Sequence, residues 1–113
     1  MSRDADLLDI TGVIYLPVDR ERLAWAAGFF DGEGYVGLSH TNFSVRVSQK
    51  SPEVLHTFRD AIGFGTVGKA GTVYQYYVYG FEKVQAVMAL LWSWLSLDSK
   101  AKFLRAMEDE VDR

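Results

Sequence analysis

Two acidic residues near the start of the chain have a type and spacing that could bind a metal ion. Asp31 and Glu33 are separated by Gly32 and followed by Gly34. Hard divalent cations such as Mg²⁺ prefer oxygen ligands, and carboxylates held where a helix ends could gather such an ion between two copies of a chain. Acidic residues between glycines are also commonly solvated turn residues, so the pair alone leaves both interpretations open.

The segment that would hold these acids is predicted to be a helix over residues 19–31. It begins at Asp19, a good capping residue, and Gly32 and Gly34 are expected to end it. A stripe of small residues recurs on it at helical spacing, formed by Ala24, Ala27, Gly28 and Asp31. Small residues let two helix backbones approach closely, and a glycine inside a helix costs about 1 kcal/mol against alanine. The stripe therefore predicts a helix–helix interface.

The rest of the chain predicts an α+β fold. Alternating apolar and polar residues indicate strands at residues 35–39, 43–49, 66–69 and 73–79. Further helices are expected at about residues 52–62, 81–95 and 99–110. The order is αββαββα(α), which predicts a four-stranded antiparallel sheet with the helices on one face and the other face open.

Strand alternation predicts which side chains line each face of that sheet. Those expected to face the core are Val36, Leu38, Phe43, Val45 and Val47. Those expected to point away are Tyr35, Gly37, Ser39, Ser44, Arg46 and Ser48. The second set can address base edges in the major groove of DNA, as other β-ribbon proteins do. A simple solvated face gives the same pattern, and the strands by themselves favour that interpretation.

Length and composition indicate one intracellular domain. With 113 residues, 49% of them hydrophobic, the chain divides into an N-terminal extension, 1–18, and a single domain, 19–113. It has no cysteine, which excludes disulfides, thiolate metal sites and a cysteine nucleophile. Residues 1–9 do not resemble a signal peptide, and the apolar stretch 84–97 is shorter than the roughly 20 residues of a membrane span. We therefore expect a protein that is not secreted and has no membrane partner.

The net charge of −3 argues against a nucleic-acid partner, because phosphate-binding proteins are usually basic. Much of the acid lies at the ends, since residues 1–9 carry a net −2 and residues 108–113 a net −3, which leaves +2 for the middle. DNA affinity would depend on where the basic residues lie. The candidates are Arg46, Lys50, Lys69, Lys100 and Lys102.

The helix and its two acids carry a resemblance to a known family. Residues Ala26–Gly34, AAGFFDGEG, resemble the nine-residue motif of the LAGLIDADG homing endonucleases. The departures are conservative, and glutamate is an accepted variant of the second acid. The resemblance implies that Glu33 binds the catalytic Mg²⁺ or Mn²⁺ and that Asp31 serves the helix end and the interface. Because the chain has one motif, it also implies a homodimer in which two copies of this helix pack together.

Two later segments agree with the family in order and spacing. Phe43–Lys50, FSVRVSQK, resembles the second strand, whose late glutamine, here Gln49, lies in the metal and water pocket. Ala61–Val67, AIGFGTV, resembles the junction between helix and third strand. In the family, a basic residue opening the last helix usually polarises active-site water or stabilises the cleaved phosphate. Lys100 is the candidate here, with Lys102 as the alternative.

The function that the resemblance implies is that of a homodimeric, sequence-specific homing endonuclease with no small-molecule substrate. Its partner is double-stranded DNA, which it cuts by metal-assisted phosphodiester hydrolysis at a long, near-palindromic site to leave short 3′ overhangs. Arg46 is the best candidate for a guanine contact. The full set of expected DNA contacts is Tyr35, Ser39, Asn42, Ser44, Arg46, Ser48, Lys50, Lys69, Gln75 and Tyr77.

Two other functions stay open. A member of the same fold can bind DNA or intron RNA without cutting, as maturases do; loss of the second acid would indicate this, but Glu33 is present. A small α+β interaction module whose motif match is accidental would fit the acidic net charge. The absence of salt-dependent DNA binding would favour that second alternative.

Overall fold

The computed structural model describes residues 19–39 and 42–112 of the chain. Its helices are α2 (Arg20–Glu33), α3 (Glu53–Ile62), α4 (Phe81–Leu91) and α5 (Leu97–Val111), with a 3₁₀ turn, η1 (Trp92–Trp94), before α5. Its strands are β1 (Gly34–Ser39), β2 (Asn42–Gln49), β3 (Thr66–Ala70) and β4 (Val73–Tyr79). The predicted extension 1–18 and the first hairpin turn at His40 and Thr41 lie outside the described residues. The predicted order of elements is confirmed.

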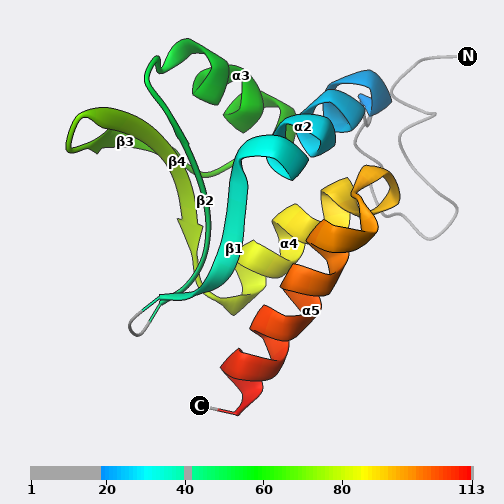
Figure 1. Cartoon of the computed structure of the whole chain (residues 1–113). Coiled ribbons are helices and arrows are strands. Elements are labelled where there is room, and N and C mark those ends of the chain that lie inside the picture. The colour runs from blue at the N-terminus through cyan, green and yellow to red at the C-terminus, as the bar shows by residue number, and fades with distance from the viewer. Residues whose placement is uncertain (1–18, 40–41, 113) are drawn as a thin grey trace, which may run out of the picture.

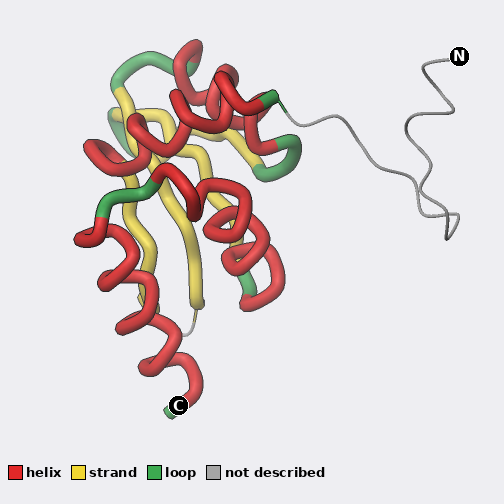
Figure 2. The backbone as a smooth tube through the Cα atoms, turned by 90° about the vertical axis from the view of Figure 1, so that its right-hand side faces the viewer, coloured by secondary structure: helices red, strands yellow, loops and turns green. Residues whose placement is uncertain are grey.

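The four strands form one antiparallel sheet in the order β1-β2-β4-β3. Each hairpin pairs its own two strands, and the hairpins join through β2 and β4 at the centre of the sheet. Figure 1 shows a strongly curved sheet with the helices gathered on one side of it, and α5 running beside the edge strand β1. In the view turned by 90° in Figure 2, the helical side faces the viewer and the strands lie behind the helices. The other face of the sheet is open.

The core lies between the sheet and α2, α3 and α4. Val45 and Val47 are fully buried there, as strand alternation predicts, and Val36 and Leu38 pack against the same cluster from the edge strand. Tyr76 is the largest fully buried side chain, and its hydroxyl donates to the carbonyl oxygen of Phe64 at 3.0 Å. Burial raises the pKa of Tyr76 far above its ordinary value, so the hydroxyl keeps the proton that this bond requires.

Three helix boundaries differ from the sequence prediction. The helix expected at about residues 81–95 ends at Leu91 as α4, and the 3₁₀ turn η1 follows it. α2 continues past residue 31 to Glu33, because Gly34 caps it in an extended conformation, with φ −85°, and not in a left-handed one. The chain therefore passes from helix to strand without a loop. α5 begins at Leu97 because the Ser96 side chain accepts a hydrogen bond from the Ser99 N–H and caps it. Among the described residues, no helix is both long and apolar enough to span a membrane.

Candidate active site and nucleic-acid interface

The end of α2 and the end of β2 together form a hollow that contains two of the predicted catalytic residues. Glu33 is the last residue of α2 and is exposed. It lines a hollow of about 390 Å³ with Gln49, the last residue of β2, and with Lys50, the residue after it. The structure therefore brings Glu33 and Gln49 to one place. A carboxylate and an amide oxygen are both hard ligands of the kind that Mg²⁺ prefers.

These ligands are too few to bind a metal ion by themselves. Within residues 19–39 and 42–112, no group of three or more His, Cys, Asp or Glu side chains could hold a metal ion. The donor chemistry fits a hard cation, but one chain offers Glu33 with Gln49 beside it. The remaining ligands would have to come from a second chain, from phosphate oxygens or from water.

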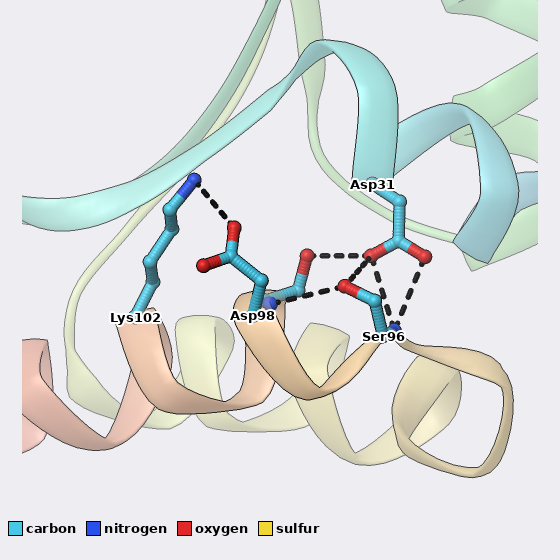
Figure 3. Close-up of polar contacts among 5 residues, drawn as sticks. Asp31, Ser96, Asp98 and Lys102 are labelled. Atoms are coloured by element: carbon cyan, nitrogen blue, oxygen red, sulfur yellow. Dashed lines mark hydrogen bonds and ion pairs between the residues drawn. The ribbon is translucent and has the colours of Figure 1, made fainter.

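Asp31 has a different environment, although it stands only two positions before Glu33. Its carboxylate accepts hydrogen bonds from the Ser96 N–H at 3.1 and 3.3 Å and from the Ser96 hydroxyl at 3.0 Å. The Ser99 hydroxyl also donates to it. Figure 3 shows this carboxylate directed at the first turn of α5. An anion is favourable there, because the N-terminus of a helix carries partial positive charge and unpaired N–H groups. Asp31 therefore ties α2 to α5.

The two candidate lysines of α5 point in different directions. Lys100 lies with its Nζ 5.2 Å from the centre of the Trp92 ring, in the turn η1. Lys102 lines a hollow of about 340 Å³ between α5 and β1, which Asp31 also lines. Its Nζ lies 3.0 Å from a carboxylate oxygen of Asp98, and Figure 3 shows Lys102 and Asp31 projecting into the same space between the two helices.

The predicted interface stripe of α2 is only partly exposed. Ala27 is fully buried in the chain's own core, and Ala24 is half-buried. Asp31 is engaged with α5 as described above. Gly28 is exposed, and a methyl group added to it would meet nothing within 4 Å. Trp25, 41% exposed, lies beside it on the helix surface. The part of α2 available to a partner is therefore centred on Gly28 and Trp25.

The open face of the sheet carries most of the predicted DNA contacts. Tyr35, Arg46 and Tyr77 stand opposite one another on β1, β2 and β4. Ser48 and Gln75 form the next row, where the Gln75 amide donates to the Ser48 hydroxyl at 3.2 Å. The two tyrosines and the arginine of the first row make this face more aromatic than a surface that contacts only solvent.

The position of Ser44 corrects the sequence prediction that its side chain is open to DNA. It has the strand parity of the open face, yet it is only 1% exposed and its Oγ has no hydrogen-bond partner. Its neighbours in register are Gly37 and Tyr79. The Tyr35 ring lies over Gly37, since a Cβ added there would come within 2.6 Å of the Tyr35 hydroxyl oxygen. Ser44 therefore lies between Tyr79 and a glycine over which the Tyr35 ring extends.

Comparison with known proteins now gives the family. Residues 20–86 match the model of the LAGLIDADG-like domain. The chain belongs to the LAGLIDADG family. No curated protein sequence matches it. Solved LAGLIDADG structures share its fold, including the homing endonuclease I-CvuI bound to the I-CreI target DNA, with a TM-score of 0.66 and 23% identity over 80% of this chain and 64% of that one.

Two further homing endonucleases have the same fold. I-TnaI has a TM-score of 0.63 and 22% identity over 79% of this chain and 71% of its own. The group I intron-encoded I-CeuI, complexed with DNA, has a TM-score of 0.65 and 16% identity over 80% of this chain and 53% of its own. This chain therefore corresponds to about 64% of the length of I-CvuI.

The LAGLIDADG motif, Ala26–Gly34, occupies the C-terminal part of α2 and the first residue of β1. Sequence reasoning missed three residues around it. Ser96 and Ser99 donate hydrogen bonds to Asp31, and the signal available in the sequence was a pair of serines at the start of a predicted helix. Tyr79 is 47% exposed and has the parity of Tyr77, so alternation along β4 could have found it.

Three further predicted contacts of the LAGLIDADG domain lie outside the two rows of the open face described above. Asn42 is exposed at the start of β2. Lys69 is exposed, but it pairs with Tyr74 and has the parity of Val67 and Tyr76, which is that of the face covered by helices. The Ser39 side chain lies outside the described residues. A DNA contact stays a prediction for all three.

Proposed function

We propose that this chain is a sequence-specific double-strand DNA endonuclease that acts as a homodimer inside the cell. The observation that carries the proposal is the exposed Glu33 carboxylate at the end of the LAGLIDADG helix, in one hollow with Gln49. Membership of the family supports the reaction class. Two of the solved relatives named above are complexes with DNA, which supports the substrate.

The homodimer follows from what one chain lacks. A single Glu33 with Gln49 is an incomplete ligand set for a hard cation, whereas two chains meeting through α2 would bring two such sets to a shared centre. The exposed Gly28 permits close approach of a second helix, because it leaves open space at its Cα. A two-fold dimer would favour a long, near-palindromic DNA site.

The chemistry expected at the site is phosphodiester hydrolysis. A bound Mg²⁺ or Mn²⁺ would supply Lewis acidity toward the phosphate and lower the pKa of a bound water. Glu33 would hold it, and Gln49 would orient water in the same hollow by donating and accepting hydrogen bonds. Cleavage across the minor groove on both strands, with short 3′ overhangs, is the outcome that the family resemblance predicts.

We assign the active-site lysine to Lys102 in preference to Lys100. Lys102 lines the hollow between α5 and β1 that the motif residues Asp31 and Gly34 also line, whereas Lys100 lies over the Trp92 ring. Lys102 can therefore approach a phosphate on the motif side of α5 without giving up a contact with an aromatic ring. The exposed ion pair of Lys102 with Asp98 holds it only weakly.

Sequence recognition is assigned to the open face of the sheet. Arg46 stands at its centre, and its guanidinium can contact the O6 and N7 atoms of guanine in the major groove. Ser48, Gln75 and Tyr77 line the same face and can make additional polar contacts.

The test is cleavage of a randomised duplex library in Mg²⁺, with sequencing of the ends. We expect the wild-type chain to cut at a near-palindrome and Glu33→Gln to abolish cutting. Glu82→Gln, the same change at an exposed glutamate of α4, serves as the matched control and should cut normally. Lys102→Met should reduce the cleavage rate far more than Lys100→Met.

Each other result has a definite meaning. Selective binding without cutting by the wild-type chain would replace this proposal with a non-cleaving DNA-binding or maturase function. Absence of salt-dependent binding to any duplex would contradict both and favour a protein interaction module. Cutting that survives Glu33→Gln would remove Glu33 from the reaction.

A further inference from the structure

The centre of the open sheet face contains an arginine whose environment is unusual for a solvated surface. The guanidinium carbon of Arg46 lies 4.9 Å from the centre of the Tyr35 ring, on the neighbouring strand. The Arg46 Nε atom is buried and has no hydrogen-bond partner. A cation over an aromatic face is stabilised by the negative charge of the ring face. The ring therefore limits the space open to the guanidinium on one side, while its buried Nε has no hydrogen-bond partner among the described residues.

The Tyr35 ring can take this position because residue 37 is a glycine. The ring lies along β1 over Gly37, where an added Cβ would come within 2.6 Å of the Tyr35 hydroxyl oxygen and 2.9 Å of the adjoining ring carbon. Any other residue at 37 would push the ring away from the sheet. The flat ring thus depends on one local sequence feature, a glycine two residues after the tyrosine on the same face.

A second unpaired polar atom lies beneath the same arrangement. Ser44, opposite Gly37, is 1% exposed, and its Oγ has no partner among the described residues. Leaving a buried polar group unpaired is unfavourable, and native proteins tolerate it mainly where function uses the group. Two such atoms, on Ser44 and Arg46, lie on adjacent positions of one strand face. Both are next to Tyr35.

We infer that Tyr35 is a positioning residue that fixes the plane of the Arg46 guanidinium and thereby sets selectivity for guanine at one position in each half of the DNA site. The inference rests on the proposed function. The planar fork of arginine discriminates guanine through two parallel hydrogen bonds, which require the plane of the fork to match the base edge. A stacked tyrosine reduces the orientations that the fork can adopt before binding, which makes binding of the matching base more favourable.

Binding selectivity of the full chain separates this role from a general DNA contact. The wild-type chain is first used to select its site from a randomised duplex library, with Ca²⁺ in place of Mg²⁺. Affinity is then measured on duplexes that carry each of the four bases at each position. We expect a preference for guanine of about 10-fold or more at one position per half-site, which Arg46→Lys removes.

Variants of Tyr35 and Gly37 test the positioning role. Tyr35→Leu should reduce the guanine preference at the same position as Arg46→Lys, and by a larger factor than it reduces affinity for unrelated duplex. Tyr35→Phe keeps the ring and should keep the preference. Gly37→Ala leaves Tyr35 in the sequence but displaces its ring, so it should act like Tyr35→Leu. Loss of affinity for every duplex equally in Tyr35→Leu would overturn the inference, because it would indicate a phosphate contact.

If no variant binds DNA, the contact between the Tyr35 ring and Arg46 can still be tested in the free protein. In NMR of the ¹⁵N-labelled chain, the chemical shift of the Arg46 Nε–H proton should be displaced from that of an exposed arginine by the ring of Tyr35. The displacement should persist in Tyr35→Phe and disappear in Tyr35→Leu and Gly37→Ala. An unshifted signal in the wild-type chain would overturn the stacked arrangement. If the signal behaves as expected but the wild-type chain shows no selective DNA binding, the proposed function fails and the inference fails with it.

Discussion

Replacing Asp31 with alanine should loosen the attachment of α5 to the rest of the domain. Three donors converge on this carboxylate: the Ser96 N–H, the Ser96 hydroxyl and the Ser99 hydroxyl. Hydrogen bonds to charged groups contribute about 1.5 to 3 kcal/mol each when they are shielded from water. Because Asp31 is exposed, water can replace part of this contribution in the variant. We therefore expect the free energy of unfolding to fall by about 2 kcal/mol, similar to the loss of a strong helix cap.

The assay is urea and thermal unfolding at several protein concentrations, because a dimer makes apparent stability depend on concentration. A loss of about 2 kcal/mol corresponds to a fall in Tm on the order of 10 °C for a domain of this size. Asp98→Ala is the matched control, since Asp98 also lies in the first turn of α5 but its side chain is 77% exposed and, within the described part of the chain, pairs only with Lys102. It should cost less than about 1 kcal/mol.

Two results would refute this reasoning. If Asp31→Ala unfolds within about 0.5 kcal/mol of the wild-type chain, then water substitutes fully for the three hydrogen bonds. If Asp98→Ala is as destabilising as Asp31→Ala, then negative charge near the start of α5 matters and the specific contacts with Ser96 and Ser99 do not.

Three glycines give further predictions. In Gly28→Ala the added methyl group meets open space within the chain and improves helix propensity, so it should raise the stability of the dilute chain by up to about 1 kcal/mol. The same change should weaken dimerisation in sedimentation experiments, because small residues let two helices approach closely. Unchanged dimerisation would show that α2 does not form the interface at this point. Gly65→Ala should destabilise by at least about 2 kcal/mol in urea unfolding, because Gly65 has φ +108° and an added Cβ would lie 2.4 Å from the Tyr76 ring. Gly71→Ala, with φ +64° but open space, should cost about 1 kcal/mol, and equal costs at the two sites would contradict the clash.

The sequence was sufficient to predict the sheet and its two faces, because alternation is a local property of each strand. Val45 and Val47 are buried, and Arg46 between them has the opposite parity. It was not sufficient to predict that Ser44 is buried on the open face, since that depends on where the Tyr35 ring lies. A side-chain direction along the sheet surface has no periodic signal in the sequence.

The environment of Asp31 was out of reach for a different reason. Its partner Ser96 is 65 residues away along the chain, and a serine pair at the start of a helix does not indicate which acid it contacts. A motif supplies the identity of an acid but gives no information on which distant helix it approaches. The choice between Lys100 and Lys102 was left open for the same reason, because it depends on which neighbour each side of α5 faces.

The separation of the two motif acids follows from helix geometry. Residues two positions apart on an α-helix point about 200° apart around its axis, so Asp31 and Glu33 cannot face the same neighbour. Asp31 faces the first turn of α5, while Glu33 faces the hollow at the end of β2. An acid tied by three donors is poorly suited to bind a metal ion, because those bonds would have to break first.

This geometry also decides how loss of Asp31 would affect cleavage. Asp31 would act through the position of α5, and therefore of Lys102, while Glu33 keeps its place on α2. A cleavage defect in Asp31→Ala should then come together with the loss of stability and with no change in the metal concentration needed for half-maximal rate. Glu33→Gln should instead abolish cleavage without loss of stability, since no hydrogen bond or ion pair of Glu33 within the described residues supports the fold. If Asp31→Ala instead raises the required metal concentration at unchanged stability, Asp31 belongs to the ligand set and the division of roles between the two acids is wrong.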